Sequence, residues 1–466
     1  MGVAFCALFA WWFVTGMVMM YWDYPVVSEA DRLARAQPLD GARIRVAPER
    51  AYAGLEVGTP PRSVQLVMLD GRPVYRFGFG RGDQRLVHAD DGTEITEFPP
   101  DLLRRVAVAW TGHSERDARF EGVLDSEDQW TVAGDFRNLR PLRKYSWADG
   151  EEVYVSEVTG AVEQYTTRAT RIGAYFGAIP HWLYFTPIRK NGRVWSRVVI
   201  GLSSLATVAA FFGLVVGIWM YAPARGIPYR GQKRLHVIFG LFFGIVACTW
   251  AFSGMLSMEP FPIEGDGGPY GTQIAAALRG KRPGLDAFAV KPARGAIAGL
   301  RVKELDFSSF AGEPVYLAWE GPDRPRVIAV AGPAFDWKRV AQIVAKAAPV
   351  EESRLLSQYD AYYLDRHQER PLPVLLVRLG DRENSRYYID PRTTRIVGSY
   401  SSDSWVWRWL YHGLHSYNFP WLYRHRPAWD MVVLALLAGG TALSVTALIL
   451  ACQLLRLKFR TIRPSD

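Results

Sequence analysis

The chain has 466 residues, of which 49% are apolar, and its 55 basic and 46 acidic side chains give a net charge of +9. This length predicts several domains rather than one hydrophobic core. The three cysteines form no C-x-x-C pair, which argues against a disulfide framework, a cysteine-bound zinc or iron–sulfur cluster and a covalently attached haem.

Four stretches are nearly free of charge and long enough to cross a bilayer: residues 2–22, 198–222, 236–258 and 431–455. A membrane helix needs about 20 apolar residues, because each residue adds only about 1.5 Å. We therefore predict four transmembrane helices, within residues 1–22, 195–222, 236–258 and 429–455.

The remaining segments are two long polar regions, 23–194 and 259–428, and two short basic ones, the loop 223–235 and the tail 456–466. Short loops rich in Lys and Arg stay on the cytoplasmic side. We expect a multi-pass protein of the bacterial inner membrane with both long regions in the periplasm. Because the excess positive charge lies mainly in the loop and the tail, it indicates topology rather than nucleic-acid binding.

The chain also repeats itself. Residues 12–17 (WFVTGM) match residues 250–255 (WAFSGM) at an offset of 238, whereas Tyr154, His181 and Trp195 match Tyr388, His415 and Trp429 at an offset of 234. The order helix, ectodomain, helix thus occurs twice in the same orientation. This predicts two parallel repeats related by an axis along the membrane normal.

Both long regions are expected to fold as α+β domains, so the fold class is membrane α+β. Residues 63–69, 74–79, 85–89, 302–307, 315–319 and 326–330 alternate in polarity between turn residues, and residues 99–109 and 337–347 have helical spacing. A second group of strands begins near 153–156 and 387–390. We predict a short helix beside a three-stranded antiparallel sheet, twice in each region.

Eight histidines are present, and four of them, His88, His113, His367 and His425, are expected to be ordinary surface residues. The other four lie at predicted membrane boundaries: His181, His236, His412 and His415. An ionisable residue at such a depth indicates function.

His181 and His415 occupy the same register in the two repeats, each 14 residues before a tryptophan. If the repeats pack about a two-fold axis, the two imidazoles face each other in an aromatic-rich bundle. Such a pair suits axial ligation of haem iron. His412, three residues before His415, is a reserve ligand. The alternative is that each histidine only binds a lipid headgroup.

His236 indicates a second, inner site. At the 238-residue offset it aligns with position −2, ahead of Met1, and no basic residue precedes the first span. We expect the native start to lie upstream and to supply a histidine that pairs with His236. Gly2 and Gly240 lie one turn further on, where a flat ring would have room. Without that upstream histidine the inner haem lacks a ligand.

Aromatic and basic residues crowd the predicted outer boundary, among them Trp182, Tyr184, Arg189, Tyr417, Trp421 and Arg424. Interfacial belts explain many such aromatic residues. The alternative is a substrate ledge over an outer haem, where a bulky anionic ferric chelate would bind. Nothing cytoplasmic is large enough to bind NAD or flavin, so electrons would come from quinol or from a separate protein.

These features resemble the PepSY-associated transmembrane family. The resemblance rests on the two W-x-x-[ST]-G-M segments and on GAIPHWLYFTPIR at 177–189, DQWTV at 128–132, YDAYYLDRH at 359–367 and GQKRLH at 231–236. It covers almost the whole chain and implies PepSY folds in the ectodomains. It also implies ligation of b-type haem by His181, His236 and His415. Some relatives are inner-membrane ferric-siderophore reductases, but the absent N-terminal histidine departs from the family pattern.

The leading hypothesis is therefore a haem-b protein that carries electrons across the membrane to a ferric-siderophore-type substrate during iron uptake. The alternative is a PepSY binding or regulatory protein without redox activity, whose helices only anchor it. A transporter is disfavoured because no predicted span contains a proline break or a buried acid.

Overall fold

The computed structural model describes residues 2–80, 83–221, 227–260, 268–332 and 335–462, with side chains described from residue 5 to residue 456. Residues 223–226 of the expected basic loop and 463–466 of the expected tail lie outside these ranges. The chain forms two compact units. The helical unit comprises Met1–Pro25, Arg168–Glu264 and Ser404–Asp466, and the sheet unit comprises Val26–Thr167 and Gly265–Asp403.

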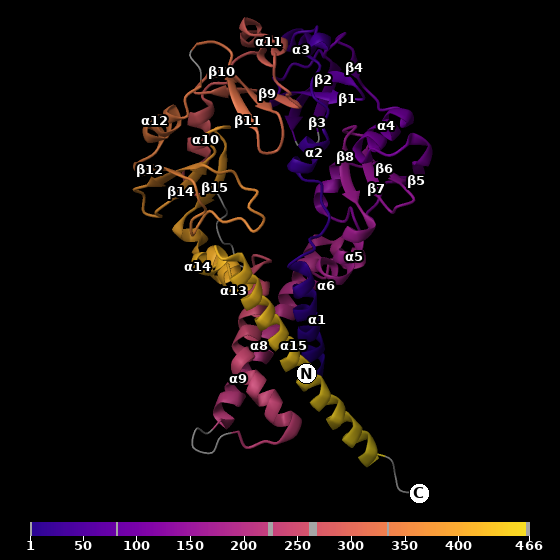
Figure 1. The fold of residues 1–466 in the computed structure, drawn as a ribbon, viewed down its shortest axis with the longest axis vertical. Coiled ribbons are helices and arrows are strands. Elements are labelled where there is room, and N and C mark those ends of the chain that lie inside the picture. The colour runs from indigo at the N-terminus through magenta and orange to yellow at the C-terminus, as the bar shows by residue number, and fades with distance from the viewer. Residues whose placement is uncertain (1, 81–82, 222–226, 261–267, 333–334, 463–466) are drawn as a thin grey trace. The chain divides into compact units, whose positions relative to one another are not determined.

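The helical unit is built on four apolar helices, α1 (Gly2–Met19), α8 (Gly192–Met220), α9 (Gly231–Leu256) and α15 (Arg426–Ile462) (Figure 1). Among the described residues, three segments are long and apolar enough to cross a membrane: Gly192–Met220, Gly231–Leu256 and Arg426–Arg456. In α1, the apolar segment Phe5–Met19 is shorter. The protein is therefore membrane-associated through its helical unit, and the sheet unit has an α+β fold.

Small residues let these helices pack closely. Helix α9 packs against both α8 and α15, and α1 packs along α15. A Cβ atom added at Gly440 of α15 would lie 2.7 Å from the ring of Phe13, and one added at Gly439 would overlap Phe243. Phe13 in turn contacts Trp250, with ring centroids 5.8 Å apart. Glycine at these two positions thus makes room for aromatic side chains of the neighbouring helices.

Short helices lead into α8 and α15. Before α8 these are α5 (Arg168–Phe176), α6 (Ala178–His181) and α7 (Thr186–Arg189). Before α15 they are a π-helix, η6 (Val406–Gly413), and the helices α13 (Leu414–Ser416) and α14 (Pro420–Tyr423). The π-helix had no counterpart in the sequence predictions.

The sheet unit contains three antiparallel sheets among the described residues. The largest has the order β11-β10-β9-β1-β2-β3-β4 and consists of β1 (Ser63–Leu69), β2 (Arg72–Gly80), β3 (Asp83–His88), β4 (Glu94–Ile95), β9 (Glu304–Phe310), β10 (Glu313–Trp319) and β11 (Pro325–Ala329). The predicted meanders are thus present. The prediction that each forms a separate three-stranded sheet is wrong, because both belong to one sheet. Strand β1 pairs with β9 and joins the two halves of the chain.

The other two sheets have four strands each, where three were expected. One contains β5 (Arg119–Leu124), β6 (Leu142–Ser146), β7 (Glu152–Ser156) and β8 (Val162–Thr166); the other contains β12 (Val350–Leu356), β13 (Val374–Leu379), β14 (Arg386–Ile389) and β15 (Ile396–Tyr400). The strands missed at the sequence level include β5 and β12, which lie at sheet edges and are largely exposed. An exposed edge strand lacks the apolar alternation on which the prediction depended.

Each four-stranded sheet is covered by a helix in nearly the predicted place. Helix α4 (Pro100–Thr111) buries Leu103 and Ala107 against the first sheet, and α12 (Lys338–Ala347) buries Val340 and Val344 near the second. Such i, i+4 pairs give a helix one apolar face. Helix α10 (Gly271–Arg279) packs beside α12, and the shorter helices of this unit are α2 (Glu29–Arg35), α3 (Pro48–Ala53) and α11 (Ala293–Ala296).

Each of the two four-stranded sheets contains a hydrogen bond from a buried tyrosine hydroxyl to an aspartate. The hydroxyl of Tyr154 in β7 donates to Asp128 at 2.8 Å, and that of Tyr388 in β14 donates to Asp360 at 2.8 Å. Each aspartate also accepts backbone N–H groups two and three residues further along the chain. The DQWTV and YDAYYLDRH segments therefore serve the same structural purpose: each closes a loop onto a buried tyrosine.

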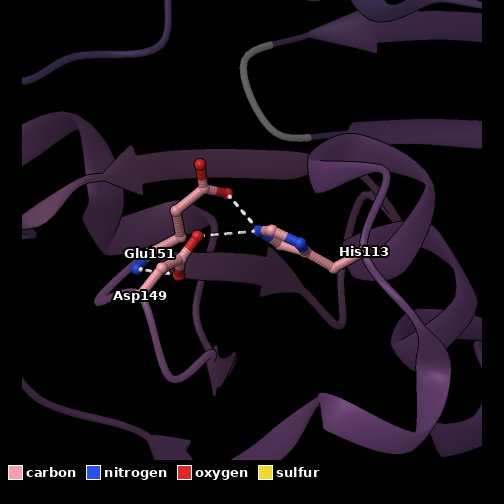
Figure 2. Close-up of side chains that lie close together, drawn as sticks. All are labelled: His113, Asp149 and Glu151. Atoms are coloured by element: carbon pink, nitrogen blue, oxygen red, sulfur yellow. Dashed lines mark hydrogen bonds and ion pairs between the residues drawn. The ribbon is translucent and has the colours of Figure 1, made fainter.

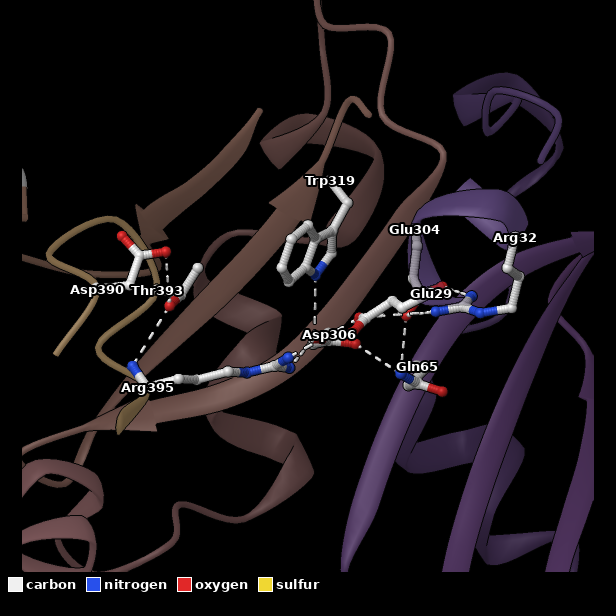
Figure 3. Close-up of polar contacts among 9 residues, drawn as sticks. All are labelled: Glu29, Arg32, Gln65, Glu304, Asp306, Trp319, Asp390, Thr393 and Arg395. Atoms are coloured by element: carbon white, nitrogen blue, oxygen red, sulfur yellow. Dashed lines mark hydrogen bonds and ion pairs between the residues drawn. The ribbon is translucent and has the colours of Figure 1, made fainter. Parts of the chain in front are cut away.

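The seam between β1 and β9 contains a buried polar network (Figure 3). The Gln65 side-chain amide donates to Glu304 and to Asp306, each at 2.9 Å. Arg32 of α2 bonds Glu304, and Arg395 donates to Asp306 at 2.8 Å. Burial, together with the nearby charge of Glu304, raises the pKa of Asp306. The two halves are thus joined by charges as well as by backbone hydrogen bonds.

Candidate cofactor site

The first of the boundary histidines, His181, ends helix α6 in the helical unit. Its Nδ1 atom lies 3.1 Å from the hydroxyl of Thr15 and 3.2 Å from the carbonyl oxygen of Trp12, both in α1. The indole of Trp11 donates to the carbonyl of Pro180 at 3.1 Å and ties α6 to the same helix. Contacts from little more than one turn of α1 thus hold α6 and the His181 ring from one side.

His415 in α13 is held in the same way by α9. Its Nδ1 atom lies 3.0 Å from the hydroxyl of Ser253, and its carbonyl oxygen accepts a hydrogen bond from the indole of Trp250 at 2.9 Å. Thr15 and Ser253 are the equivalent residues of the two W-x-x-[ST]-G-M segments. The repeated motif therefore provides one hydroxyl for each histidine.

These hydroxyl groups favour one tautomer of both rings. The Thr15 hydroxyl donates its hydrogen to the carbonyl of Trp11 at 2.8 Å, and the Ser253 hydroxyl donates to the carbonyl of Trp250 at 3.2 Å. A hydroxyl has a single hydrogen, so a hydroxyl that donates to its carbonyl accepts from the Nδ1–H of its histidine. The lone pair of each imidazole is then on Nε2, the arrangement found in metal-binding histidines whose other nitrogen donates a hydrogen bond.

The glycine of the same motif gives each ring its space. A Cβ atom at Gly16 would lie 3.5 Å from Cε1 of His181, and one at Gly254 would lie 3.7 Å from Cε1 of His415. The ring edges therefore lie directly against the helix backbone. In both copies the hydroxyl residue bonds the imidazole and the next residue lets it approach.

The two rings lie next to each other, with centroids 6.3 Å apart and planes at 66°. Burial lowers the pKa of both His181 and His415 well below the usual value for histidine, and for His181 the neighbouring His415 adds to the effect. Both imidazoles are therefore neutral at neutral pH. Neutral imidazole is the form that binds a metal.

His412 has different neighbours. It lies in the π-helix, where its ring packs against Trp407 at 5.5 Å and Tyr411 at 4.8 Å between centroids. Tyr411 also stacks on His415 at 5.4 Å. The structure thus places His181 next to His415, whereas His412 packs with Trp407 and Tyr411.

His236, in α9, contacts α15. Its Nδ1 atom lies 3.1 Å from the hydroxyl of Thr446, which itself donates to the carbonyl of Leu443 at 2.8 Å. This third boundary histidine therefore also presents Nε2 as the free nitrogen. Thr446 was missed at the sequence level, because it lies outside any repeated motif. Gly2 lies in α1 but before residue 5, where the description of side chains begins, so the expected space beside it is not described.

The residues of the expected substrate ledge do not form one contact network: Trp182, Tyr184 and Arg189 pack together, whereas Tyr417 and Trp421 have other neighbours. Trp182 and Tyr184 pack together at 5.8 Å, and the guanidinium of Arg189 lies over Tyr184 at 4.7 Å and over Trp195 at 4.6 Å. Tyr417 packs instead against Trp250 at 5.6 Å. Trp421 is 70% exposed, and its carbonyl contacts His425, while Arg424 follows α14. Arg189 is thus engaged with aromatic rings rather than extended into solvent.

Comparison with known proteins adds no assignment. No protein-family model matches this chain, and no curated protein matches it.

Proposed function

We propose that this protein is a haem-b electron-transfer protein that reduces an extracytoplasmic ferric chelate of the siderophore type. The observation that carries the proposal is the pair His181 and His415, whose Nδ1 atoms are both bonded to hydroxyl groups and whose rings lie 6.3 Å apart. The two histidines come from different helices, lie beside each other and share one tautomer. A histidine that only binds a lipid headgroup does not require such an arrangement.

The spacing of the rings fits a shared iron ion. Imidazole nitrogen binds a metal ion at about 2 Å. The ring centroids of His181 and His415 are 6.3 Å apart, so the two side chains are close enough to hold one iron ion together. Haem bound here would supply one-electron transfer between its ferric and ferrous states.

The protein side chains would bind, orient and insulate that group. His181 and His415 would hold the haem iron through Nε2, and Thr15 and Ser253 would keep those nitrogens deprotonated by accepting from Nδ1–H. Tyr411 stacks on His415, and Tyr417 packs against Trp250, whose indole bonds the His415 carbonyl. These rings would limit the access of water, which would favour electron transfer over side reactions.

We further propose that α1 is a fourth membrane span, so that the helical unit consists of two parallel repeats. Its packing along α15 and the equivalence of Thr15 with Ser253 support this arrangement. The two four-stranded sheets, each with its helix, would then be PepSY-like domains in the bacterial periplasm. His236 and Thr446 would mark an inner haem site near the opposite end of the bundle.

The ledge residues would bind the anionic chelate outside the membrane. Trp182, Tyr184 and Arg189 form a cationic aromatic surface, and the exposed ring of Trp421 adds a second flat face. Such surfaces attract large anions through charge and ring contacts. Quinol or a separate protein would donate the electrons. The alternative, a PepSY regulatory protein without redox activity, does not explain why two histidines are both bonded to hydroxyl groups.

The proposal is tested by following electrons through the purified protein in detergent. After chemical reduction and removal of the excess reductant under argon, a ferric hydroxamate chelate is added in the presence of a ferrous-specific dye. We expect reoxidation of the haem spectrum together with one ferrous ion released per haem oxidised. The His415→Ala variant should release none, while the matched His425→Ala variant should behave as wild type. Absence of any haem in the wild-type protein would refute the proposal.

A further inference from the structure

A cluster of metal-binding side chains lies in the sheet unit, in the part formed by residues 26–167. His113 follows the end of α4, and Asp149 and Glu151 lie on the turn between β6 and β7 (Figure 2). One potential ligand atom from each residue lies within 4.8 Å of the others. In the described part of the chain, this is the one group of three such residues.

The turn holds its two carboxylates in place. The backbone N–H of Glu151 donates to Oδ1 of Asp149 at 3.0 Å, and the N–H of Trp147 donates to the carbonyl of Glu151 at 3.0 Å. The indole of Trp147 packs on the imidazole of His113 with centroids 5.8 Å apart. The three side chains are therefore positioned by the fold before any ligand arrives.

The converging atoms are close but lack good hydrogen bonds. Nε2 of His113 lies 3.0 Å from Oδ2 of Asp149 and 3.5 Å from Oε2 of Glu151. Nε2 of His113 and Oε2 of Glu151 are nonetheless both shielded from solvent without a hydrogen-bond partner of acceptable geometry among the described residues. Shielded polar atoms without partners are costly, which makes them candidates for an unobserved ligand.

We propose that His113, Asp149 and Glu151 bind a divalent first-row transition-metal ion. Two carboxylates with one imidazole nitrogen favour ions such as Zn²⁺, Mn²⁺ or Fe²⁺ over Ca²⁺ and Mg²⁺, which prefer oxygen ligands alone. The side chains of His113 and Asp149 keep 37% and 49% of their surface exposed, so water can complete the coordination. The ion would neutralise the repulsion between the two carboxylates.

This site belongs to one half of the chain. At the offset that matches Tyr154 with Tyr388, Asp149 and Glu151 correspond to Glu383 and Ser385. Where His113 stands two residues after the end of α4, Pro349 stands two residues after the end of α12. The second half therefore offers neither the imidazole nor the second carboxylate, and serves as an internal reference. The proposal is independent of haem binding.

The competing explanation is an ion pair, in which protonated His113 contacts the two acids without a metal. The test is titration of the full-length, metal-stripped protein in detergent with Zn²⁺ at pH 7, measured by competition with a chromogenic chelator. We expect one Zn²⁺ bound per protein, lost in His113→Ala and weakened at least tenfold in Asp149→Asn and Glu151→Gln. Excess Mg²⁺ should not compete.

His367→Ala is the matched control, because it removes another histidine of the same unit. Its Zn²⁺ affinity should equal that of the wild type. Far-ultraviolet circular dichroism shows that each variant is folded, and Co²⁺ substitution gives a visible spectrum that reports nitrogen and oxygen ligands. Stoichiometric binding that survives His113→Ala, or no stoichiometric binding by the wild type, would overturn the proposal.

Discussion

The helical unit and the sheet unit use the internal duplication in different ways. In the helical unit, matching residues converge on one place: Thr15 bonds His181, Ser253 bonds His415, and the two rings lie together. In the sheet unit each half builds its own four-stranded sheet with its own Asp–Tyr bond, and the halves join at β1 and β9. Duplicated residues therefore meet at one place in the helical unit and remain in separate sheets in the sheet unit.

The seam of the sheet unit gives the largest expected change in stability. Replacing Glu304 by Gln removes the buried carboxylate that Arg32 contacts and leaves that partly buried guanidinium with only the exposed carboxylate of Glu29. We expect the free energy of unfolding of the sheet unit to fall by about 2–3 kcal/mol, below the range for fully buried pairs because Arg32 keeps some exposure. Urea denaturation followed by tryptophan fluorescence measures this change.

Glu29→Gln is the control for the seam, because Glu29 also contacts Arg32 but its side chain is 55% exposed. It should change the free energy of unfolding very little. Equal effects of the two substitutions would mean that the seam network does not hold the halves together.

The equivalence of the two histidine sites can be tested through their hydroxyl partners. Thr15→Val and Ser253→Ala each remove the hydroxyl that contacts one Nδ1 atom, and for His181 the carbonyl of Trp12 remains nearby. Loss of such a bond typically weakens metal binding by 10- to 100-fold, so both variants should lose haem more readily and shift its reduction potential. Thr15→Ser keeps the hydroxyl and should restore the wild-type values. A shift in one variant alone would break the equivalence of the two copies.

The smallest predicted effect concerns the meander of the first half. Arg72 bonds Asp90 and holds the pKa of that carboxyl below its usual range. Because the folded-state pKa is lowered, this stabilisation is present above about pH 4 and is lost as the pH falls through the folded-state value. Asp90→Asn should lower the free energy of unfolding by about 1 kcal/mol at pH 7. The difference from wild type should shrink below pH 4 in chemical denaturation, and a constant difference at all pH values would contradict this account.

The sequence predicted those elements whose signals are local. Residues 63–69 form β1 as expected, and the helices predicted at 99–109 and 337–347 correspond to α4 and α12. The pairing of β1 with β9 joins residues more than 200 positions apart, and nothing in either strand indicates its partner. Glu304 and Asp306 look like the solvent-facing residues of an alternating strand, although both are buried in the seam.

The candidate site was predicted only in part, because some of its contacts join residues that are distant in the sequence. The repeat register indicated that His181 and His415 would meet, because equivalent positions face each other across a pseudo-two-fold axis. The hydroxyl groups of Thr15 and Ser253 were visible in the repeated motif, but their role depends on how α6 and α13 fold back onto α1 and α9. His113 was expected to be an ordinary surface residue, because its neighbours Asp149 and Glu151 are distant in sequence.

The central claim is that His181 and His415 together bind one haem, and a reduced-minus-oxidised absorbance spectrum with a haem-to-protein ratio tests it most directly. The account predicts the spectrum of a low-spin b-type haem in the wild-type protein. One haem per protein should be lost in His181→Ala and equally in His415→Ala, whereas His412→Ala should retain it. Loss in His412→Ala with retention in His415→Ala would move the ligand by one turn. An unchanged ratio in both His181→Ala and His415→Ala would contradict the account.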